Sequence, residues 1–85
     1  MAEKILIVDD DVETRRLVGL MLHRQGYTTV AAGSGQEAIE VTLSEKPDLI
    51  LLDIMMPDLD GYEVTRRLRA NPVTQDTPII MFSAK

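Results

Sequence analysis

Acidic residues follow directly after two of the most apolar segments of the chain. Asp9 and Asp10 come after the run at residues 5–8, and Asp53 comes after the run at residues 49–52. Carboxylates that are brought close together repel one another, and they stay ionised only when a cation compensates their charge. All-oxygen ligands favour a hard divalent ion, above all Mg²⁺. A carboxylate can also act as a nucleophile, and its attack on phosphorus gives an aspartyl phosphate. These residues therefore suggest magnesium-assisted phosphoryl chemistry.

The surrounding sequence alternates between segments typical of strands and of helices. Runs rich in leucine and β-branched residues predict strands over residues 4–8, 27–32, 48–52 and 78–82. Helices are predicted over residues 12–25, between Ser34 and Pro47, and over residues 60–70. The order β-α-β-α-β-α-β predicts an α/β fold with a doubly wound parallel sheet, because parallel strands need crossovers. In such sheets ligands bind at the carboxyl ends of the strands, where Asp9, Asp10, Asp53 and Ser83 would converge.

Local signals predict where the helices begin and end. Gly26 is placed to end the first helix in a left-handed conformation. Ser34 with Glu37 fits a capping box, in which the hydroxyl accepts from the Glu37 amide and the carboxylate reaches back. Asp60 with Glu63 repeats that pattern at the start of the third helix.

The first helix is predicted to carry one apolar face. Leu17, Leu20 and Met21 recur at helical spacing and are expected to face the sheet, while Arg15 faces water. His23 lies on the same charged stretch and is interpreted as a surface histidine rather than a phosphoryl-carrying one.

Composition excludes several classes of protein. The chain has 85 residues, a net charge of −5 and no cysteine. Its scattered basic residues and few aromatic residues disfavour direct binding of nucleic acid. Its longest apolar runs fall far short of the roughly 20 residues needed to span a membrane. The absence of cysteine fits a reducing, cytoplasmic setting.

Three segments carry a family resemblance. Residues 5–11 (ILIVDDD) resemble the opening of the receiver domain of two-component response regulators. Residues 51–61 (LLDIMMPDLDG) resemble the phosphoacceptor strand and loop of that family, and residues 78–84 (PIIMFSA) are similar to its fourth strand. The resemblance implies a flavodoxin-like fold with the strand order 2-1-3-4 and a regulatory phosphoprotein rather than an enzyme.

The resemblance also implies a role for each site residue. Asp53 would accept a phosphoryl group from a phosphohistidine of a sensor histidine kinase. Asp10 would bind Mg²⁺ directly, and Asp9 would bind it directly or through water. The remaining metal ligands would be Asp53 and the backbone carbonyl of Met55. The Ser83 hydroxyl and the Ala84 amide would hold phosphoryl oxygens.

Residues 1–85 would then be the N-terminal portion of a receiver domain that lacks the last helix, strand and helix. In the family the fifth strand carries a lysine that pairs with the phosphoryl group. Lys85 follows Ser83 and Ala84 too closely to be that lysine. Phosphorylation of this chain at Asp53 is therefore expected to be slow or undetectable.

Two alternative functions remain open at this point. One is an interaction module that forms a homodimer through the edge of the fourth strand. The other is a phosphohydrolase of the haloacid dehalogenase type, whose nucleophile lies in an Asp-x-Asp-x-Thr/Val motif after the first strand. In this chain Glu13 stands where that motif has its final residue.

Several residues near the motifs have plainer interpretations. Asp11, Asp58 and Asp60 are expected to be solvated or to cap helices rather than to bind metal. Met55 and Met56 are expected to serve loop packing and backbone positioning, so that only the carbonyl of Met55 matters for a metal.

Overall fold

The structure, a computed structural model, describes residues 3–83. In that range it contains four strands and three helices: β1 (Lys4–Val8), α1 (Val12–Arg24), β2 (Thr28–Ala32), α2 (Gly35–Glu45), β3 (Leu49–Asp53), α3 (Gly61–Arg69) and β4 (Ile79–Phe82). The predicted elements are confirmed, with boundaries that differ by about one residue at most. Within these residues, no helix has both the length and the apolar character needed to cross a membrane.

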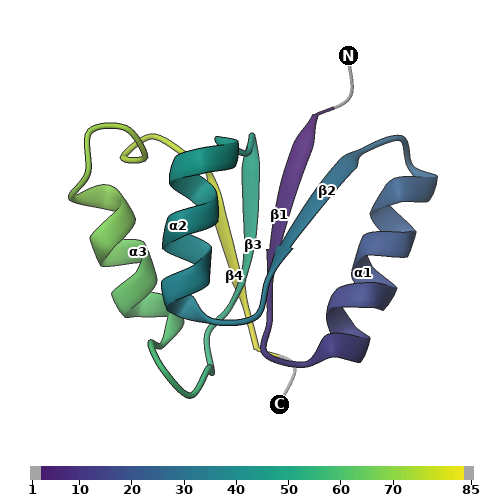
Figure 1. Ribbon diagram of the computed structural model, residues 1–85, viewed down its shortest axis with the longest axis horizontal. Coiled ribbons are helices and arrows are strands. Elements are labelled where there is room, and N and C mark those ends of the chain that lie inside the picture. The colour runs from purple at the N-terminus through teal and green to yellow at the C-terminus, as the bar shows by residue number, and fades with distance from the viewer. Residues whose placement is uncertain (1–2, 84–85) are drawn as a thin grey trace.

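All the strands run parallel, in the order β2-β1-β3-β4, which confirms the predicted doubly wound sheet (Figure 1). β1 and β3 are the central strands, and the register places Val8 beside Leu52. On the other side of β3, Asp53 lies beside Phe82 of β4. The carboxyl ends of the three strands β1, β3 and β4 therefore meet at one edge of the sheet.

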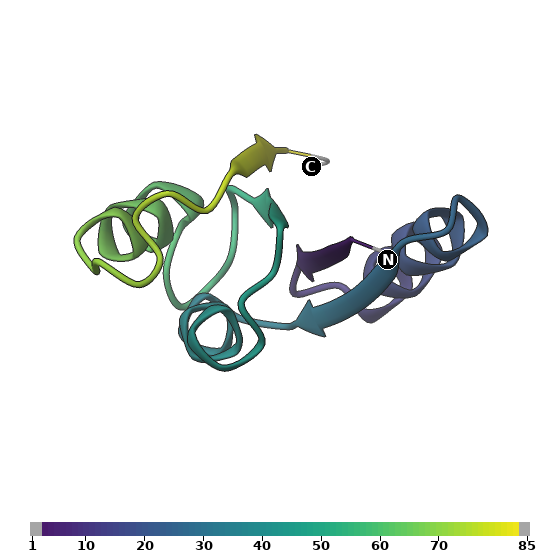
Figure 2. The ribbon, with the colours of Figure 1, turned by 90° about the horizontal axis from the view of Figure 1, so that it is seen from above.

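α2 and α3 cover one face of the sheet, and α1 lies on the opposite face (Figure 2). After Lys4, strand β1 is apolar because both of its faces are covered, and its residues from Ile5 to Val8 are at most 4% exposed. The face under α2 and α3 holds the core cluster Leu6, Val8, Ala32, Ala38, Ile50, Leu52, Met56, Val64 and Leu68. Burying one such aliphatic side chain contributes about 1.5–3 kcal/mol to stability.

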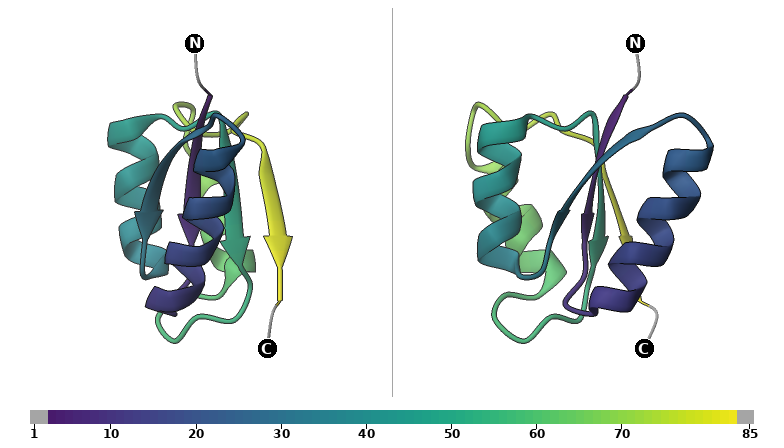
Figure 3. Two further views of the ribbon diagram at one scale, coloured as in Figure 1. Left: turned by 90° about the vertical axis from the view of Figure 1, so that its right-hand side faces the viewer. Right: turned by 45° about the vertical axis from the view of Figure 1, so that its right-hand side comes forward.

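The prediction for the face of α1 was wrong. Leu17, Leu20 and Met21 are 59%, 48% and 57% exposed, and no residue of α1 is buried. The helix instead turns Gly19 toward the sheet, where a Cβ atom would lie 3.6 Å from Cδ1 of Ile7. The right-hand view of Figure 3 shows α1 on the opposite side of the strands from α2. Gly19 thus faces the sheet, Val18 and Leu22 are half-buried, and Leu17, Leu20 and Met21 face outward.

The ends of α1 and α2 follow the predicted signals with one change. Gly26 has a φ of 95°, in the left-handed region, as predicted. The Ser34 hydroxyl accepts a hydrogen bond from the Glu37 amide at 3.1 Å. The Glu37 carboxylate reaches back to the amide of Gly33 at 2.7 Å, one residue before the position expected for a capping box. At the far end of α2, Lys46 adopts a left-handed conformation with a φ of 48°.

Two of the aspartates interpreted as helix caps do cap helices locally. Asp11 accepts a hydrogen bond from the Glu13 amide at 3.0 Å at the start of α1. Asp60 accepts one from the Glu63 amide at 2.8 Å at the start of α3. His23 is exposed near the end of α1, as the surface interpretation requires.

Candidate functional site

The carboxyl edge of the sheet brings together the three aspartates that the sequence predicts as metal ligands. One carboxylate oxygen from each of Asp9, Asp10 and Asp53 lies within 4.8 Å of those of the other two. Asp9 and Asp53 are buried, at 1% and 0% exposure, and Asp10 is exposed. The sheet register explains the meeting, because Val8 and Leu52 are paired and the next residue of each strand is an aspartate.

Several contacts fix the turn that follows β1. The Asp9 amide donates a hydrogen bond to the Ala32 carbonyl at 3.2 Å. The Asp9 carboxylate accepts one from the Asp11 amide at 2.9 Å. Arg15 donates through Nη1 to the Asp9 carbonyl at 2.7 Å, so this side chain does not simply face water as predicted. These bonds hold the backbone that presents Asp9 and Asp10.

Hydrogen bonds also fix the base of the loop that follows β3. The Asp53 carboxylate accepts a hydrogen bond from the Met55 amide at 3.1 Å. The Gly61 amide donates to the Ile54 carbonyl at 2.8 Å and closes the base of the loop. A Cβ atom at position 61 would lie 2.9 Å from Cα of Ile54, so the closure requires glycine.

The two methionines of this loop have different environments. Met56 is 8% exposed and belongs to the core cluster, which confirms its packing role. Met55 is 56% exposed, so loop packing does not account for its side chain. An open hollow of about 500 Å³ beside the loop is lined by Ile54, Met55, Met56, Pro57, Asp60 and Tyr62.

The donor set at the carboxyl edge fits a magnesium ion. Three carboxylates at this separation repel one another, and a divalent cation relieves that repulsion. All three donors are hard oxygen atoms, which Mg²⁺ prefers, and the exposed Asp10 leaves one side open for the waters that this ion retains. The residues present therefore suit the predicted metal.

Ser83 follows β4 at the same edge. Its neighbour Phe82 pairs with Asp53, and the Phe82 carbonyl accepts a hydrogen bond from the Ile54 amide at 2.9 Å. Ser83 therefore lies one position beyond the strand partner of Asp53 and is exposed. Ala84, whose amide is predicted to hold a phosphoryl oxygen, lies outside the described residues.

The lysines within residues 3–83 lie at the opposite edge. Lys4 begins β1 and forms an ion pair with Glu45 at 3.0 Å. Lys46 follows the last turn of α2, which leads to the amino end of β3. Neither ammonium group is placed to reach a group bound at Asp53, and Lys85 lies outside the described residues.

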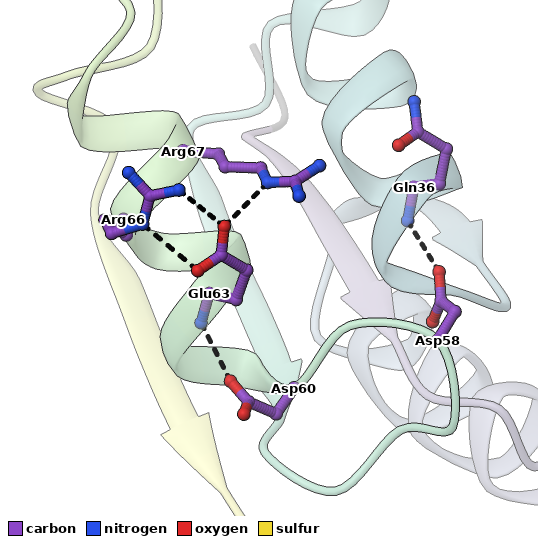
Figure 4. A network of polar contacts seen from close by, with 6 residues as sticks. All are labelled: Gln36, Asp58, Asp60, Glu63, Arg66 and Arg67. Atoms are coloured by element: carbon purple, nitrogen blue, oxygen red, sulfur yellow. Dashed lines mark hydrogen bonds and ion pairs between the residues drawn. The ribbon is translucent and has the colours of Figure 1, made fainter.

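Asp58 has a role that sequence reasoning identified only in general terms. Its two carboxylate oxygens accept hydrogen bonds from the Gly35 and Gln36 amides, each at 3.0 Å. Figure 4 shows the bond to Gln36. These amides open α2, more than twenty residues away, so Asp58 caps a distant helix. The Gly35 amide contributes most to holding the pKa of Asp58 below its ordinary value, and the Gln36 amide adds to that effect.

Glu63 forms a second charged cluster, on the outer face of α3. Its carboxylate accepts hydrogen bonds from Arg66 at 2.6 and 3.0 Å and from Arg67 at 2.8 Å (Figure 4). These bonds, with that from Arg66 the strongest, lower the pKa of Glu63 to about 2. The Glu63 carboxylate was predicted to turn back toward the start of α3, as in a capping box. In the structure it pairs with Arg66 and Arg67 instead.

Comparison with known proteins places these features in a family. The chain matches the family described as "Response regulator receiver domain" over residues 5–85. It is 45% identical over 85 residues to the alkaline phosphatase synthesis transcriptional regulatory protein PhoP of Bacillus subtilis, a match that covers 100% of the chain and 35% of that protein. The chain spans about a third of the length of the curated relatives it matches.

Solved structures agree with this match. The N-terminal domain of a response regulator receiver protein from Methanoculleus marisnigri JR1 has a TM-score of 0.95 and 41% identity, with 100% of this chain and 69% of that one covered. The receiver domain of the sensor histidine kinase PA1611 from Pseudomonas aeruginosa PAO1 has a TM-score of 0.92 and 32% identity, with 100% and 70% covered. That structure has a magnesium ion coordinated in its active site cleft.

Proposed function

The chain belongs to the response regulator receiver domain family, and from this premise we propose that it accepts a phosphoryl group on Asp53 in a two-component phosphorelay. One observation carries the choice of residue. Asp53 is fully buried at the carboxyl edge of the sheet, within 4.8 Å of two further carboxylates. Such a cluster suits a nucleophilic carboxylate that works beside a metal ion.

In the proposed reaction a carboxylate oxygen of Asp53 attacks the phosphorus atom of a phosphohistidine on a sensor histidine kinase. An O–P bond forms while the P–N bond breaks, and the electron pair of the broken bond stays on the imidazole nitrogen. The product is an aspartyl phosphate. The hydrogen bond from the Met55 amide orients the Asp53 carboxylate for this attack.

We assign the metal site to Asp9, Asp10, Asp53 and the Met55 carbonyl. When bound, Mg²⁺ supplies positive charge that offsets the negative charge on the transferring phosphoryl oxygens. The chain itself fixes the ligands, because Arg15 and the Asp11 amide hold the turn at Asp9. Ser83 is proposed to donate a hydrogen bond from its hydroxyl to a phosphoryl oxygen, together with the amide of Ala84.

The partner we propose is a sensor histidine kinase in the cytoplasm. The relatives described as transcriptional regulators are about three times as long as this chain. We therefore assign no transcriptional role to these 85 residues. We propose no direct contact between these 85 residues and nucleic acid, because their net charge of −5 disfavours binding to a polyanion.

Labelling with a small phosphodonor tests the proposal. The chain is incubated with acetyl phosphate and Mg²⁺, and intact mass spectrometry measures the phosphoryl adduct. The adduct is expected in the wild type and in Asp76→Asn, an exposed aspartate far from the site, and not in Asp53→Asn. An adduct that persists in Asp53→Asn would refute the assignment. Turnover of a generic phosphate ester would indicate a phosphohydrolase instead.

The labelling is expected to be slow. Neither described lysine lies at the carboxyl edge, and the loss of one positive charge beside a developing anion costs on the order of several kcal/mol in the transition state. Rapid stoichiometric labelling would show that such a lysine is not required, or that another chain supplies it.

A second candidate function is self-association. In the described residues β4 pairs with β3 on one side only, and Ile80 and Met81 are 54% and 37% exposed. An apolar edge strand is a template for pairing with another chain. A chain that self-associates and never takes up label would act as an interaction module rather than as a phosphoacceptor.

A further inference from the structure

The loop between β3 and α3, residues 54–60, carries the Met55 carbonyl assigned above to the metal. Two hydrogen bonds control the base of this loop, one from the Met55 amide to Asp53 and one from the Gly61 amide to the Ile54 carbonyl. Neither bond involves the tip of the loop, at residues 57–59. The position of the tip therefore depends on other contacts.

Asp58 provides the contact at the tip. Its carboxylate accepts one hydrogen bond per oxygen from the first two amides of α2, Gly35 and Gln36, at 3.0 Å each. The Gln36 bond is drawn in Figure 4. The amino terminus of a helix favours a negative charge, and a two-point contact fixes orientation as well as distance. The lowered pKa of Asp58 agrees with this geometry, since the amide bonds favour its ionised form.

Close packing supports the same contact. Gly35 is buried, and a Cβ atom at this position would lie 2.6 Å from Cβ of Leu59 and 2.9 Å from Cγ2 of Val64. Leu59 in turn packs against the core cluster. The loop is thus seated directly on α2, and the Asp58 bonds lie beside a packed interface rather than on an isolated surface turn.

We propose that Asp58 is a positioning residue that strengthens Mg²⁺ binding by holding the loop that carries Met55 against α2. The inference rests on the proposed function, because it takes the Met55 carbonyl as a metal ligand. Without the Asp58 contact, the loop would be more mobile in the metal-free protein. Metal binding would then have to order the loop, and this loss of conformational entropy would weaken binding. Asp58 itself acts through the backbone and contacts α2 rather than the metal.

Titration with Mg²⁺ of the 85-residue chain, followed by amide chemical shifts, tests the inference. Asp58→Ala is expected to raise the dissociation constant for Mg²⁺ by about threefold to tenfold. Asp58→Asn keeps one acceptor oxygen and is expected to give an intermediate value. If Asp58→Ala fails to fold, as judged by circular dichroism, Asp58→Asn alone carries the comparison, and a wild-type affinity in it would overturn the inference.

Two control variants separate positioning from general destabilisation. Ser34→Ala removes the other cap of α2 but leaves the Asp58 bonds in place. Asp76→Ala removes one negative charge at an exposed position away from the site. Both are expected to bind Mg²⁺ within about twofold of the wild type. Equal weakening in Ser34→Ala and Asp58→Ala would overturn the inference.

A measurement without metal distinguishes this inference from the proposed function. Relaxation of the ¹⁵N nuclei of Met55 and Met56 in the metal-free protein is expected to show larger motion in Asp58→Ala and unchanged motion in Ser34→Ala. Unchanged motion in Asp58→Ala would overturn the positioning role whatever the metal result. Absence of Mg²⁺ binding by the wild type, with increased motion in Asp58→Ala, would refute the metal assignment while supporting the positioning of the loop.

Discussion

Asp10 is the exposed member of a group of three carboxylates, and its removal changes the site with least damage to the fold. Asp9 and Asp53 are buried, so their replacement disturbs packing as well as charge. Asp10 is exposed, and in the proposed site it supplies one metal ligand and one negative charge. Substitution of Asp10 is therefore the clearest way to test the metal site through the effect of Mg²⁺ on the melting temperature.

We expect Mg²⁺ to raise the melting temperature of the wild type and to have little effect on Asp10→Ala. A ligand that binds only the folded state stabilises it by RT ln(1 + [L]/Kd), and the variant loses one of the ligands. Thermal unfolding with and without Mg²⁺ measures both shifts, with Asp76→Ala as a charge-matched control that keeps the wild-type shift. An equal shift in Asp10→Ala would contradict the site.

Glu63 predicts a pH dependence of stability. Its pKa is about 2 in the folded chain against an ordinary value of 4.5, so the folded state favours the ionised form. The resulting stabilisation is fully present above about pH 4.5 and is lost as the pH falls through about 2. We therefore expect Glu63→Gln to lower the urea midpoint near neutral pH and to lose less stability than the wild type on acidification.

The control for this prediction is Glu13→Gln. Glu13 pairs with Arg16 at 3.5 Å, but both side chains are more than 70% exposed, and such a pair contributes little. Its acid response is expected to match that of the wild type. Identical acid responses of Glu63→Gln and the wild type would show that the cluster on α3 does not stabilise the fold.

At the scale of elements, strands were easier to predict than the faces of helices. The strands are apolar because both faces of the sheet are covered, so a short apolar run identifies them directly. Helical spacing in α1 showed which residues share a face, but not which face meets the sheet. Leu17 and Leu20 were predicted to face inward because they are apolar and share a face, whereas the structure places Gly19 next to Ile7 of β1.

The aspartates at the strand ends could be predicted from the sequence. The contact between Asp58 and the start of α2 could not. Asp9 directly follows β1 and Asp53 is the last residue of β3, and parallel pairing places such residues together. Asp58 gave no such signal. Its partners, Gly35 and Gln36, are set by how α2 and the loop pack in space, which no spacing within the sequence encodes.

The backbone conformation at the end of α2 predicts how a substitution there changes stability. Lys46 follows the helix in a left-handed conformation, which costs a residue with a side chain about 1–2 kcal/mol and glycine much less. Glycine also has more freedom in the unfolded chain, which offsets part of the gain. We expect Lys46→Gly to raise the free energy of unfolding by about 0.5–1 kcal/mol in urea titrations.

A matched substitution inside the same helix should have the opposite sign. Ser44 is an exposed residue of α2 with ordinary helical geometry. Ser44→Gly is expected to lower the free energy of unfolding by about 0.5 kcal/mol, the ordinary penalty for glycine within a helix. A loss of stability in Lys46→Gly would mean that the lysine side chain contributes more than its backbone conformation costs.

At the scale of the whole molecule, the exposed edge of β4 predicts self-association. We expect the 85-residue chain to form a dimer through this edge, probed by sedimentation at micromolar concentration. Ile80→Lys places a charge on the edge and is expected to shift the protein toward monomer. Val73→Lys adds the same charge at a position that is 61% exposed in the α3–β4 connection and should leave the dimer intact. A compact wild-type monomer would refute the prediction.

The central place of β1 has a consequence for how the protein is made. Synthesis proceeds from the amino end, so β1 leaves the ribosome before either of its neighbours. Its first partner, β2, ends at Ala32, and its second, β3, ends only at Asp53. Until the ribosome has passed that point, the most buried strand of the finished sheet has at least one unpaired side. The nascent chain therefore pairs both sides of β1 late, and its core cluster, which includes Val64 and Leu68 of α3, is completed later still.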